Sequence, residues 1–249
     1  MQKLLGPIGV LVTLLFCVGF PALSGTNETD QPFGAFEFGT PYASGWEQWR
    51  RIKVDILTEL PRLNACHDKT EGCTQPERRF MEIVTEAEAQ RGIGRIEVVN
   101  RRINGAIKYT PDKTQWGVAD RWSAPFTADG QGSFETGKGD CEDFAAAKFV
   151  ALYLVGVPLA SMRVVIVRDK VVHLDHAILA VHHEARWLIL ENRHDELHED
   201  KVYNTFTPLV LVDSQGVGKL ARSFRISDRR SRDFTSADTT RMERRPLSE

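Results

Sequence analysis

The sequence has no excess of positive charge. Its 32 Lys and Arg residues face 34 Asp and Glu residues, which leaves a formal net charge of −2. Proteins that bind nucleic acid present a basic surface to the phosphates, so this composition gives no support for a nucleic-acid partner. Internal repeats and extended low-complexity segments are also missing. With 42% hydrophobic residues, the chain is expected to form one well-buried domain of about 200 residues.

Long apolar segments are missing beyond the N-terminus. Residues 1–24 have a positive charge near their start, at Lys3, then a short apolar core, and then small residues at their end. This is the order of a secretory signal peptide. The apolar core is too short to span a bilayer comfortably, although a retained membrane anchor is the alternative. Phe16 before Cys17 argues against a lipidation site. We therefore expect a periplasmic or secreted protein, with the signal peptide cleaved near residue 24.

The folded domain is expected to cover residues 25–226. Its first part, residues 25–43, is rich in Gly, Pro, Thr and Phe and is interpreted as an irregular arm. From about residue 227 the sequence is rich in Ser, Arg and Asp and poor in apolar residues. Residues 227–249 are therefore predicted to be a mobile polar tail.

Cysteine is scarce, with four residues in the chain. Cys17 leaves with the signal peptide. Cys66 and Cys73 flank a short polar loop, and an exported protein meets an oxidising compartment, which favours a local disulfide. A metal pair is the weaker alternative, since no nearby His or Cys completes a ligand set. Cys141 is then an unpaired thiol and a candidate nucleophile, although a small buried core residue is the alternative.

Cys141 precedes an apolar run of good helix formers. Two glycines, Gly137 and Gly139, come before it, and residues 144–154 contain neither proline nor glycine. The pattern predicts that Cys141 lies in the first turn of a buried helix. Unpaired N–H groups and a partial positive charge at a helix N-terminus stabilise a thiolate.

The other predicted elements place helices before this segment and strands after it. The helices are about residues 44–60, ended by Pro61, a second helix opened by a capping box at Thr74 and closed by Gly92, and about residues 96–107. Residues 108–140 are expected to be a long loop that forms one wall of a cleft. Strands are predicted at residues 162–167, 176–182 and 186–191, the last two joined by a tight turn at Glu184-Ala185. The fold class is therefore α+β, with helices packed on an antiparallel sheet.

A cysteine nucleophile needs a base and a group that orients the base. In the predicted hairpin, His176 and Glu191 lie diagonally on one face, within reach of each other. Asp195 is the alternative acid if the strand continues. A cysteine on a helix, with a histidine and an acid on neighbouring strands, is the papain-like arrangement.

The remaining histidines are given no catalytic role. His173, Asp175 and His176 could be interpreted as a metal cluster, but they lack the H-E-x-x-H spacing and a clear third ligand. His182 and His183 lie in or next to the predicted turn.

Three segments together resemble a known family. They are Gly-Asp-Cys-Glu-Asp-Phe at 139–144, His-Ala-Ile-Leu at 176–179 and Leu-Ile-Leu-Glu-Asn at 188–192. They are similar to the bacterial transglutaminase-like cysteine proteinases, the family that includes the LapG-type periplasmic proteases. The similarity extends upstream through residues 99–100 and 120–122 to the Cys66/Cys73 pair.

The resemblance implies a papain-like, transglutaminase-like fold in which Cys141 is the nucleophile and His176 the general base. The third member is usually Asp in this family, and Glu191 stands at that position here. The resemblance also implies a calcium ion bound by acids that flank the cysteine, namely Asp140, Glu142 and Asp143. Independently, three carboxylates next to Cys141 disfavour a thiolate by like-charge repulsion, and a cation would offset this. The alternative is that these acids only complement a helix N-terminus.

The resulting prediction is an exported cysteine protease that hydrolyses peptide bonds. Transfer of the same thioester to an amine, as in transglutaminases or amidases, is an alternative, and a non-catalytic binding module on the same fold is another. From the resemblance we expect a protein substrate such as a surface adhesin, and an inner-membrane cyclic-di-GMP receptor as a partner. A monomer is the default expectation.

Overall fold

The computed structural model describes residues 31–38, 43–68, 71–213 and 217–222. The expected signal peptide and polar tail lie outside these residues. Within the described part, no helix is both long and apolar enough to cross a membrane.

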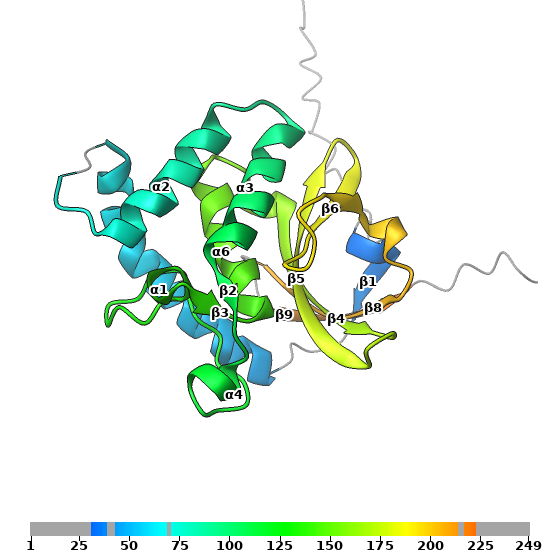
Figure 1. Ribbon diagram of the computed structural model, residues 1–249. Helices are drawn as coiled ribbons and strands as arrows, with labels where there is room; N and C mark the ends of the chain where they lie inside the picture. Colours follow the sequence, from blue (N-terminus) through cyan, green and yellow to red (C-terminus); the bar gives the residue numbers. More distant parts are fainter. Residues whose placement is uncertain (1–30, 39–42, 69–70, 214–216, 223–249) are drawn as a thin grey trace, which may run out of the picture.

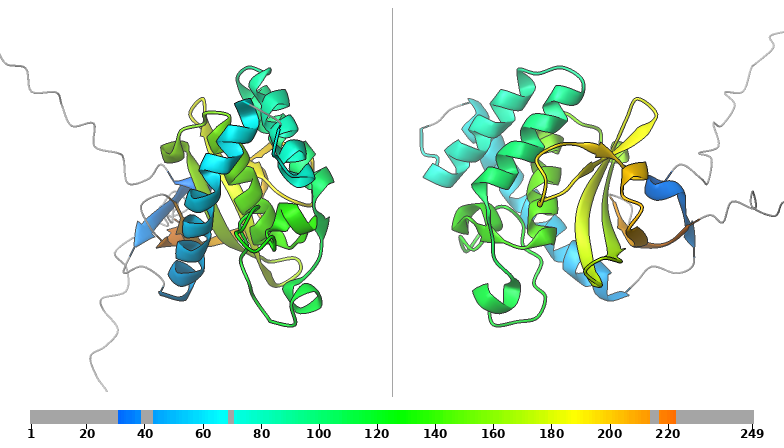
Figure 2. Two further views of the ribbon diagram at one scale, coloured as in Figure 1. Left: turned by 90° about the vertical axis from the view of Figure 1, so that its left-hand side faces the viewer. Right: turned by 45° about the vertical axis from the view of Figure 1, so that its right-hand side comes forward.

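Four helices cover one face of a sheet (Figure 1). They are α1 (Ala43–Asp68), α2 (Gln75–Glu88), α3 (Ile93–Ala106) and α6 (Cys141–Leu154). The right-hand view of Figure 2 shows the same separation of helices from strands. Shorter helical turns are η1 (Pro32–Gly34), α4 (Asp112–Gln115), α5 (Ser133–Thr136), η2 (Leu159–Ser161) and η3 (Asp200–Val202). Because α6 packs directly on the central strands, its first residue lies at the boundary between the helices and the sheet.

The main sheet is antiparallel throughout, in the order β1-β9-β8-β4-β5-β6-β7. Its strands are β1 (Ala35–Phe38), β4 (Met162–Asp169), β5 (Leu174–His183), β6 (Arg186–Leu190), β7 (His198–Glu199), β8 (Phe206–Val212) and β9 (Val217–Arg222). A separate parallel pair joins β2 (Lys108–Tyr109) to β3 (Lys138–Gly139). The architecture confirms the predicted α+β class.

Apolar side chains fill both faces of the main sheet. Leu179 and Leu188 join the core that the helices cover, together with Phe80 and Ile103. The opposite face holds a second core, built from alternate positions such as Val165, Val167, Ile178, Ile189 and Phe206. Alternation with a period of two along a strand sends neighbouring residues to opposite faces. The central strands are therefore buried on both sides, which makes them a rigid support for a site.

Several local predictions are confirmed. Thr74 and Glu77 form a capping box at the start of α2, and Cys66 and Cys73 form a disulfide. The hairpin turns at Glu184-Ala185, where both residues have positive φ, and His183 pairs with Arg186. Each of these features depends on residues close together in the chain.

Other predictions are wrong at element boundaries. Helix α1 continues past Pro61 to Asp68, because Leu63 and Cys66 are buried against the core. Helix α2 ends at Glu88, and Gly92 with its positive φ instead precedes α3.

Two predicted irregular segments contain regular structure. The arm holds strand β1, which pairs with β9 near the end of the described chain. The expected long loop holds the short elements β2, α4, α5 and β3. Strands β8 and β9 had no counterpart in the sequence prediction. The strands among these elements pair with distant segments, β1 with β9, β2 with β3 and β8 with β4.

Lys148 is a buried cation within α6. Its side chain is fully buried, and its Nζ makes no hydrogen bond to any described residue. The Phe144 ring centroid lies 5.9 Å from Nζ. Burial lowers the pKa of Lys148 to about 7, although the charges of Glu191 and Asp195 act in the opposite direction. The ammonium group is therefore a cost to the folded state.

Replacing Lys148 by methionine is expected to raise the free energy of unfolding by about 1–4 kcal/mol near neutral pH, since methionine fills a similar volume without charge. As pH falls from 10.5 to 7, the unfolded chain takes up a proton on Lys148 that the folded chain does not. The folded wild-type protein is therefore most stable, as far as Lys148 is concerned, above pH 10.5, where the lysine is neutral in both states, and it loses this stability as the pH falls toward 7. The stability advantage of the methionine variant should accordingly shrink as the pH rises. Urea unfolding of the wild type and the variant between pH 7 and 10.5 measures this difference in the free energy of unfolding. A pH-independent difference would contradict the prediction.

Candidate active site

Cys141 is the first residue of α6. The helix follows from its sequence of alanine, leucine and phenylalanine, and it starts where the Asp140 backbone N–H donates to Asp143 Oδ2 at 3.2 Å. Gly139 leaves room for this contact, because a Cβ there would lie 2.6 Å from Asp143 Oδ2. The predicted position of Cys141 in the first turn of a buried helix is confirmed.

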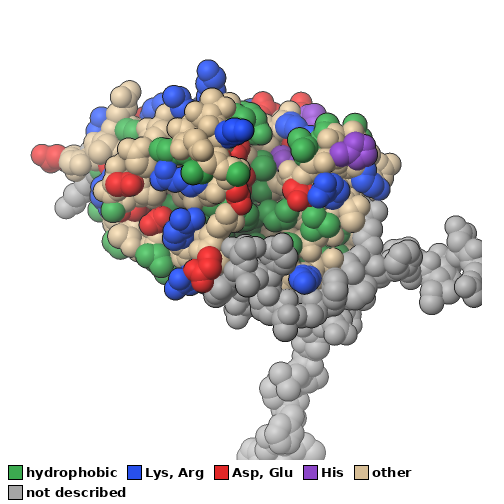
Figure 3. Space-filling view, turned by 90° about the horizontal axis from the view of Figure 1, so that it is seen from below, with side chains coloured by type: hydrophobic (Ala, Val, Ile, Leu, Met, Phe, Trp, Pro, Cys, Tyr) green, Lys and Arg blue, Asp and Glu red, His purple; other side chains and the backbone are tan. Residues whose placement is uncertain are grey.

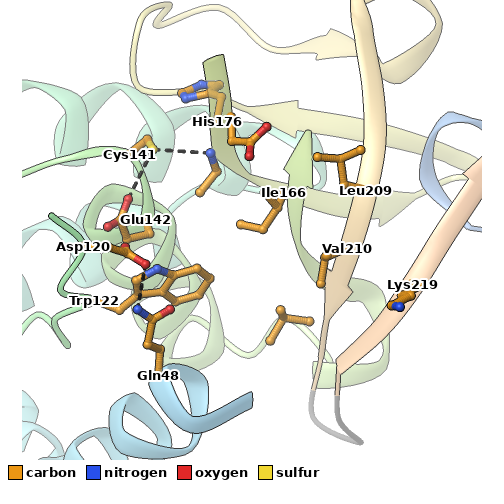
Figure 4. A pocket seen from close by; sticks show the side chains of 13 residues that line it. Gln48, Asp120, Trp122, Cys141, Glu142, Ile166, His176, Leu209, Val210 and Lys219 are labelled. Carbon is orange, nitrogen blue, oxygen red and sulfur yellow. Dashed lines mark hydrogen bonds between the residues drawn. The ribbon is translucent and has the colours of Figure 1, made fainter. Parts of the chain in front are cut away.

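The Cys141 thiol has two partners. The Ala177 backbone N–H on β5 donates to Sγ at 3.3 Å, and Sγ lies 3.2 Å from Glu142 Oε2 (Figure 4). Burial and the neighbouring Glu142 carboxylate raise the pKa of the thiol. Both effects disfavour the thiolate, which is the nucleophilic form of cysteine.

His176 and Glu191 are hydrogen-bonded across β5 and β6. The distance from His176 Nε2 to Glu191 Oε1 is 3.0 Å. Leu179 pairs with Leu190 in the hairpin, and this register brings the two side chains together. Burial would raise the pKa of Glu191, but hydrogen bonds from His176 and Arg193 outweigh it and hold the pKa at about 2. Because Nε2 is occupied by Glu191, Nδ1 is the ring nitrogen left for a reacting thiol.

Asp195 lies in a different environment from Glu191. Its Oδ1 accepts a hydrogen bond from Asn104 Nδ2 at 3.1 Å, and its backbone oxygen accepts one from Asn100 Nδ2 at 2.9 Å. Asn104 also donates to the Glu191 backbone oxygen. The asparagines of α3 thus fix the segment after β6, and the acid that this segment brings to His176 is Glu191.

Cys141 and His176 both line a cleft of about 530 Å³. Figure 4 shows Glu142, Asp120 and Trp122 along one wall, with Ile166, Leu209 and Val210 on the other side. Seen from below, acidic and apolar side chains line a hollow between the helical part and the sheet (Figure 3). The expectation that the loop before Cys141 walls a cleft therefore agrees with the position of Trp122.

Five carboxylates gather beside the cysteine. Ligand atoms of Asp112, Asp140 and Asp143 lie within 4.8 Å of one another, and so do those of Asp112, Asp120 and Glu142. The three acids predicted from the sequence thus fall into two overlapping groups joined by Asp112. Asp112 and Asp120 were not among the predicted ligands, although Asp120 belongs to a segment that carries the family resemblance.

Backbone N–H groups satisfy only part of this acidic cluster. Ser123 N donates to Asp143 Oδ1 at 2.8 Å, Asp112 N donates to Asp140 Oδ2 at 3.1 Å, and Arg121 N donates to Asp112 Oδ2. The Oδ1 atoms of Asp112 and Asp140 are buried and accept no hydrogen bond from the described residues. Burial and the neighbouring acids raise the pKa of Asp112 to about 6 and that of Glu142 to about 10.

The rival histidine cluster has other partners. Asp175 pairs with Arg168 at 2.7 Å, and His173 has a positive φ in the turn between β4 and β5. His182 packs on Trp187. In the described part of the chain, the residue groups able to hold a metal include none of these histidines.

Comparisons with known proteins identify the family of the chain and match its fold. A family model described as bacterial transglutaminase-like cysteine proteinase matches residues 61–207. The solved structure of Legionella pneumophila LapG is 20% identical, with a TM-score of 0.52 over 63% of this chain and 87% of that chain. Its calcium-bound form is 21% identical, with a TM-score of 0.52 over 64% and 86% of the two chains. Its EGTA-treated form is 20% identical, with the same TM-score over 65% and 90%. None of the curated proteins matches the sequence.

Proposed function

Because the chain belongs to the bacterial transglutaminase-like cysteine proteinases and is a cysteine peptidase of that family, we propose that Cys141, His176 and Glu191 form its catalytic triad. The observation that carries the proposal is the buried hydrogen bond between His176 and Glu191, because His176 lines the same cleft as Cys141, the one free thiol among the described residues. A nucleophile and a base in one cleft, with a buried acid behind the base to orient it, are the parts that covalent catalysis requires.

The proposed reaction is acyl transfer to water. His176 Nδ1 takes the proton of Cys141, and the thiolate attacks a peptide carbonyl. Backbone N–H groups at the start of α6 stabilise the oxyanion. The imidazolium then protonates the leaving amine, which leaves a thioester on Cys141. His176 finally activates a water that hydrolyses the thioester, while Glu191 holds the imidazole in the tautomer with its proton on Nε2.

The acidic cluster fits a calcium ion. Calcium prefers several carboxylate oxygens, and the cluster presents Asp112, Asp120, Asp140, Glu142 and Asp143 around two buried oxygens that lack donors. We propose that these acids hold the ion, and that Asp112 and Asp120 join the three ligands expected from the sequence. A bound cation would draw the Glu142 carboxylate away from the thiol and offset the negative charge beside it.

Calcium is therefore expected to raise the thermal unfolding midpoint of EGTA-treated protein, while magnesium, which demands a more rigid octahedral site, has little effect. Replacing Asp140 or Asp112 by asparagine should weaken calcium binding at least about tenfold. Asp129→Asn is the matched control, since Asp129 is an exposed acid of the same loop that is hydrogen-bonded to Thr127. Calorimetric titration gives the affinities. An unchanged midpoint in excess calcium would remove the ion from the proposal.

The protease reaction is tested with a peptide library incubated in H₂¹⁸O and analysed by mass spectrometry. Hydrolysis predicts new C-termini that carry ¹⁸O. Amine transfer instead predicts joined peptides and released ammonia, and a binding module predicts no change in any peptide. If joined peptides appeared without any cleavage, the proposed reaction would be transamidation and not hydrolysis.

Export is proposed from the N-terminal pattern together with the Cys66–Cys73 disulfide, which suits an oxidising compartment. A surface adhesin as substrate, a cyclic-di-GMP receptor as partner and the monomeric state stay predictions from the resemblance.

A further inference from the structure

Arg193 contacts the same carboxylate oxygen as His176. Glu191 Oε1 accepts three hydrogen bonds, from His176 Nε2 at 3.0 Å, from Arg193 Nε at 2.6 Å and from the Arg193 backbone N–H at 3.3 Å. Glu191 follows the last residue of β6 and has a long side chain. Fixing this side chain in one rotamer costs conformational entropy, which the hydrogen bonds must offset. Arg193 therefore holds the carboxylate at the atom that faces the imidazole.

Arg193 is itself anchored on the far side of β5. Its Nη1 donates to Asp169 Oδ2 at 3.0 Å, and the Asp169 side chain is 5% exposed at the end of β4. The sheet order is β4-β5-β6, so this ion pair crosses the strand that carries His176. A planar guanidinium can hold two carboxylates at fixed angles, which a lysine ammonium cannot do.

The Phe206 ring lies beside both Arg193 and His176. The Arg193 guanidinium lies 5.7 Å from the Phe206 ring centroid, and the His176 ring lies 6.0 Å from it. The second carboxylate oxygen of Glu191 is buried and accepts no hydrogen bond from the described residues, with His194 Nε2 at 3.7 Å. The orientation of Glu191 therefore depends on the contacts made by its Oε1.

We propose that Arg193 is a positioning residue, which bridges Asp169 and Glu191 across β5 and thereby fixes the acid against His176. This inference rests on the proposed triad. Arg193 reaches the thiol only through Glu191 and His176, so it should have no effect once the Glu191 carboxylate is removed.

The test measures the rate at which iodoacetamide alkylates Cys141, read by peptide mass spectrometry, in the mature protein with excess calcium. Arg193→Met is expected to slow alkylation about tenfold or more, the effect of losing a charge-assisted hydrogen bond. The loss should grow as pH falls, because removing Arg193 raises the pKa of Glu191 and lets it protonate at a higher pH. The other titratable or charged groups facing Glu191 are His176, His194, Lys148 and Tyr203. Arg193→Lys, which keeps the charge but not the bridge, should be intermediate and serves if the methionine variant does not fold.

A second readout reports position directly. A proton on His176 Nε2 that is bonded to a carboxylate should give a downfield NMR signal, which Arg193→Met is expected to broaden or shift. Arg186→Met is the matched control: Arg186 starts β6, pairs with Glu199 at 3.4 Å and has a side chain 38% exposed, against 40% for Arg193. This variant should change neither readout.

The Glu191→Gln background separates the possible failures. If Glu191→Gln reacts as fast as wild type, the triad assignment fails. If it is slow while Arg193→Met reacts normally, the triad stands and the positioning role is wrong. Faster alkylation in Arg193→Met would show that Arg193 competes with His176 and would also overturn the inference. A further decrease of the alkylation rate when Arg193→Met is added to Glu191→Gln would overturn the inference as well.

Discussion

Replacing Cys141 by alanine is expected to abolish cleavage of the peptide library, a loss of at least about 10³-fold. The described residues contain one free thiol, since Cys66 and Cys73 are joined in a disulfide. No other side chain of the described cleft is a comparable nucleophile, because its remaining lining is apolar, acidic or amide except for His176 and Lys219. Alanine also suits the first turn of a helix, so α6 should form as before.

The control for this variant is Asp129→Asn, which changes an exposed acid of the loop before α6 and should cleave at the wild-type rate. Thermal unfolding and circular dichroism of Cys141→Ala should show an intact fold. If the alanine variant still produced ¹⁸O-labelled C-termini at a comparable rate, hydrolysis would not pass through a cysteine thioester. If even the wild-type thiol is inert toward iodoacetamide at neutral pH, the result supports a non-catalytic binding module on the same fold.

The parts of the site that could be predicted from sequence depend on local geometry. The helix starting at Cys141 follows from an uninterrupted run of good helix formers after two glycines. The contact between His176 and Glu191 follows from a two-residue turn, because the turn sets the register and alternation sets the face. Neither inference required knowledge of where distant segments lie.

The parts that could not be predicted depend on contacts between distant segments. Asp112 precedes Asp140 by 28 residues, and the β2–β3 pairing brings their segments together. Arg193 reaches Asp169 across a strand, which a pattern of residues along one segment does not reveal. Pro61 ended the predicted helix on propensity alone, whereas burial of Leu63 and Cys66 carries α1 through it.

Glu191→Gln is expected to slow both peptide cleavage and Cys141 alkylation by roughly 10²-fold or more. Glutamine keeps the shape of the side chain but loses the charge that stabilises the imidazolium. If its amide nitrogen faces His176, the proton on Nε2 also loses its acceptor, and the ring no longer presents Nδ1 as the base. The effect should fall on kcat rather than on KM, because Glu191 is nearly fully buried and does not line the cleft.

Asp195→Asn separates the two acids that the sequence left as alternatives. Asp195 Oδ1 accepts a hydrogen bond from Asn104, and an asparagine at this position still offers an oxygen to the same donor. The variant should therefore cleave library peptides within about threefold of wild type, since a conserved hydrogen bond leaves the segment after β6 in place. The reverse pattern, with slow Asp195→Asn and normal Glu191→Gln, would assign the acid to Asp195. It would also mean that the hydrogen bond between His176 and Glu191 serves the stability of the hairpin rather than the reaction.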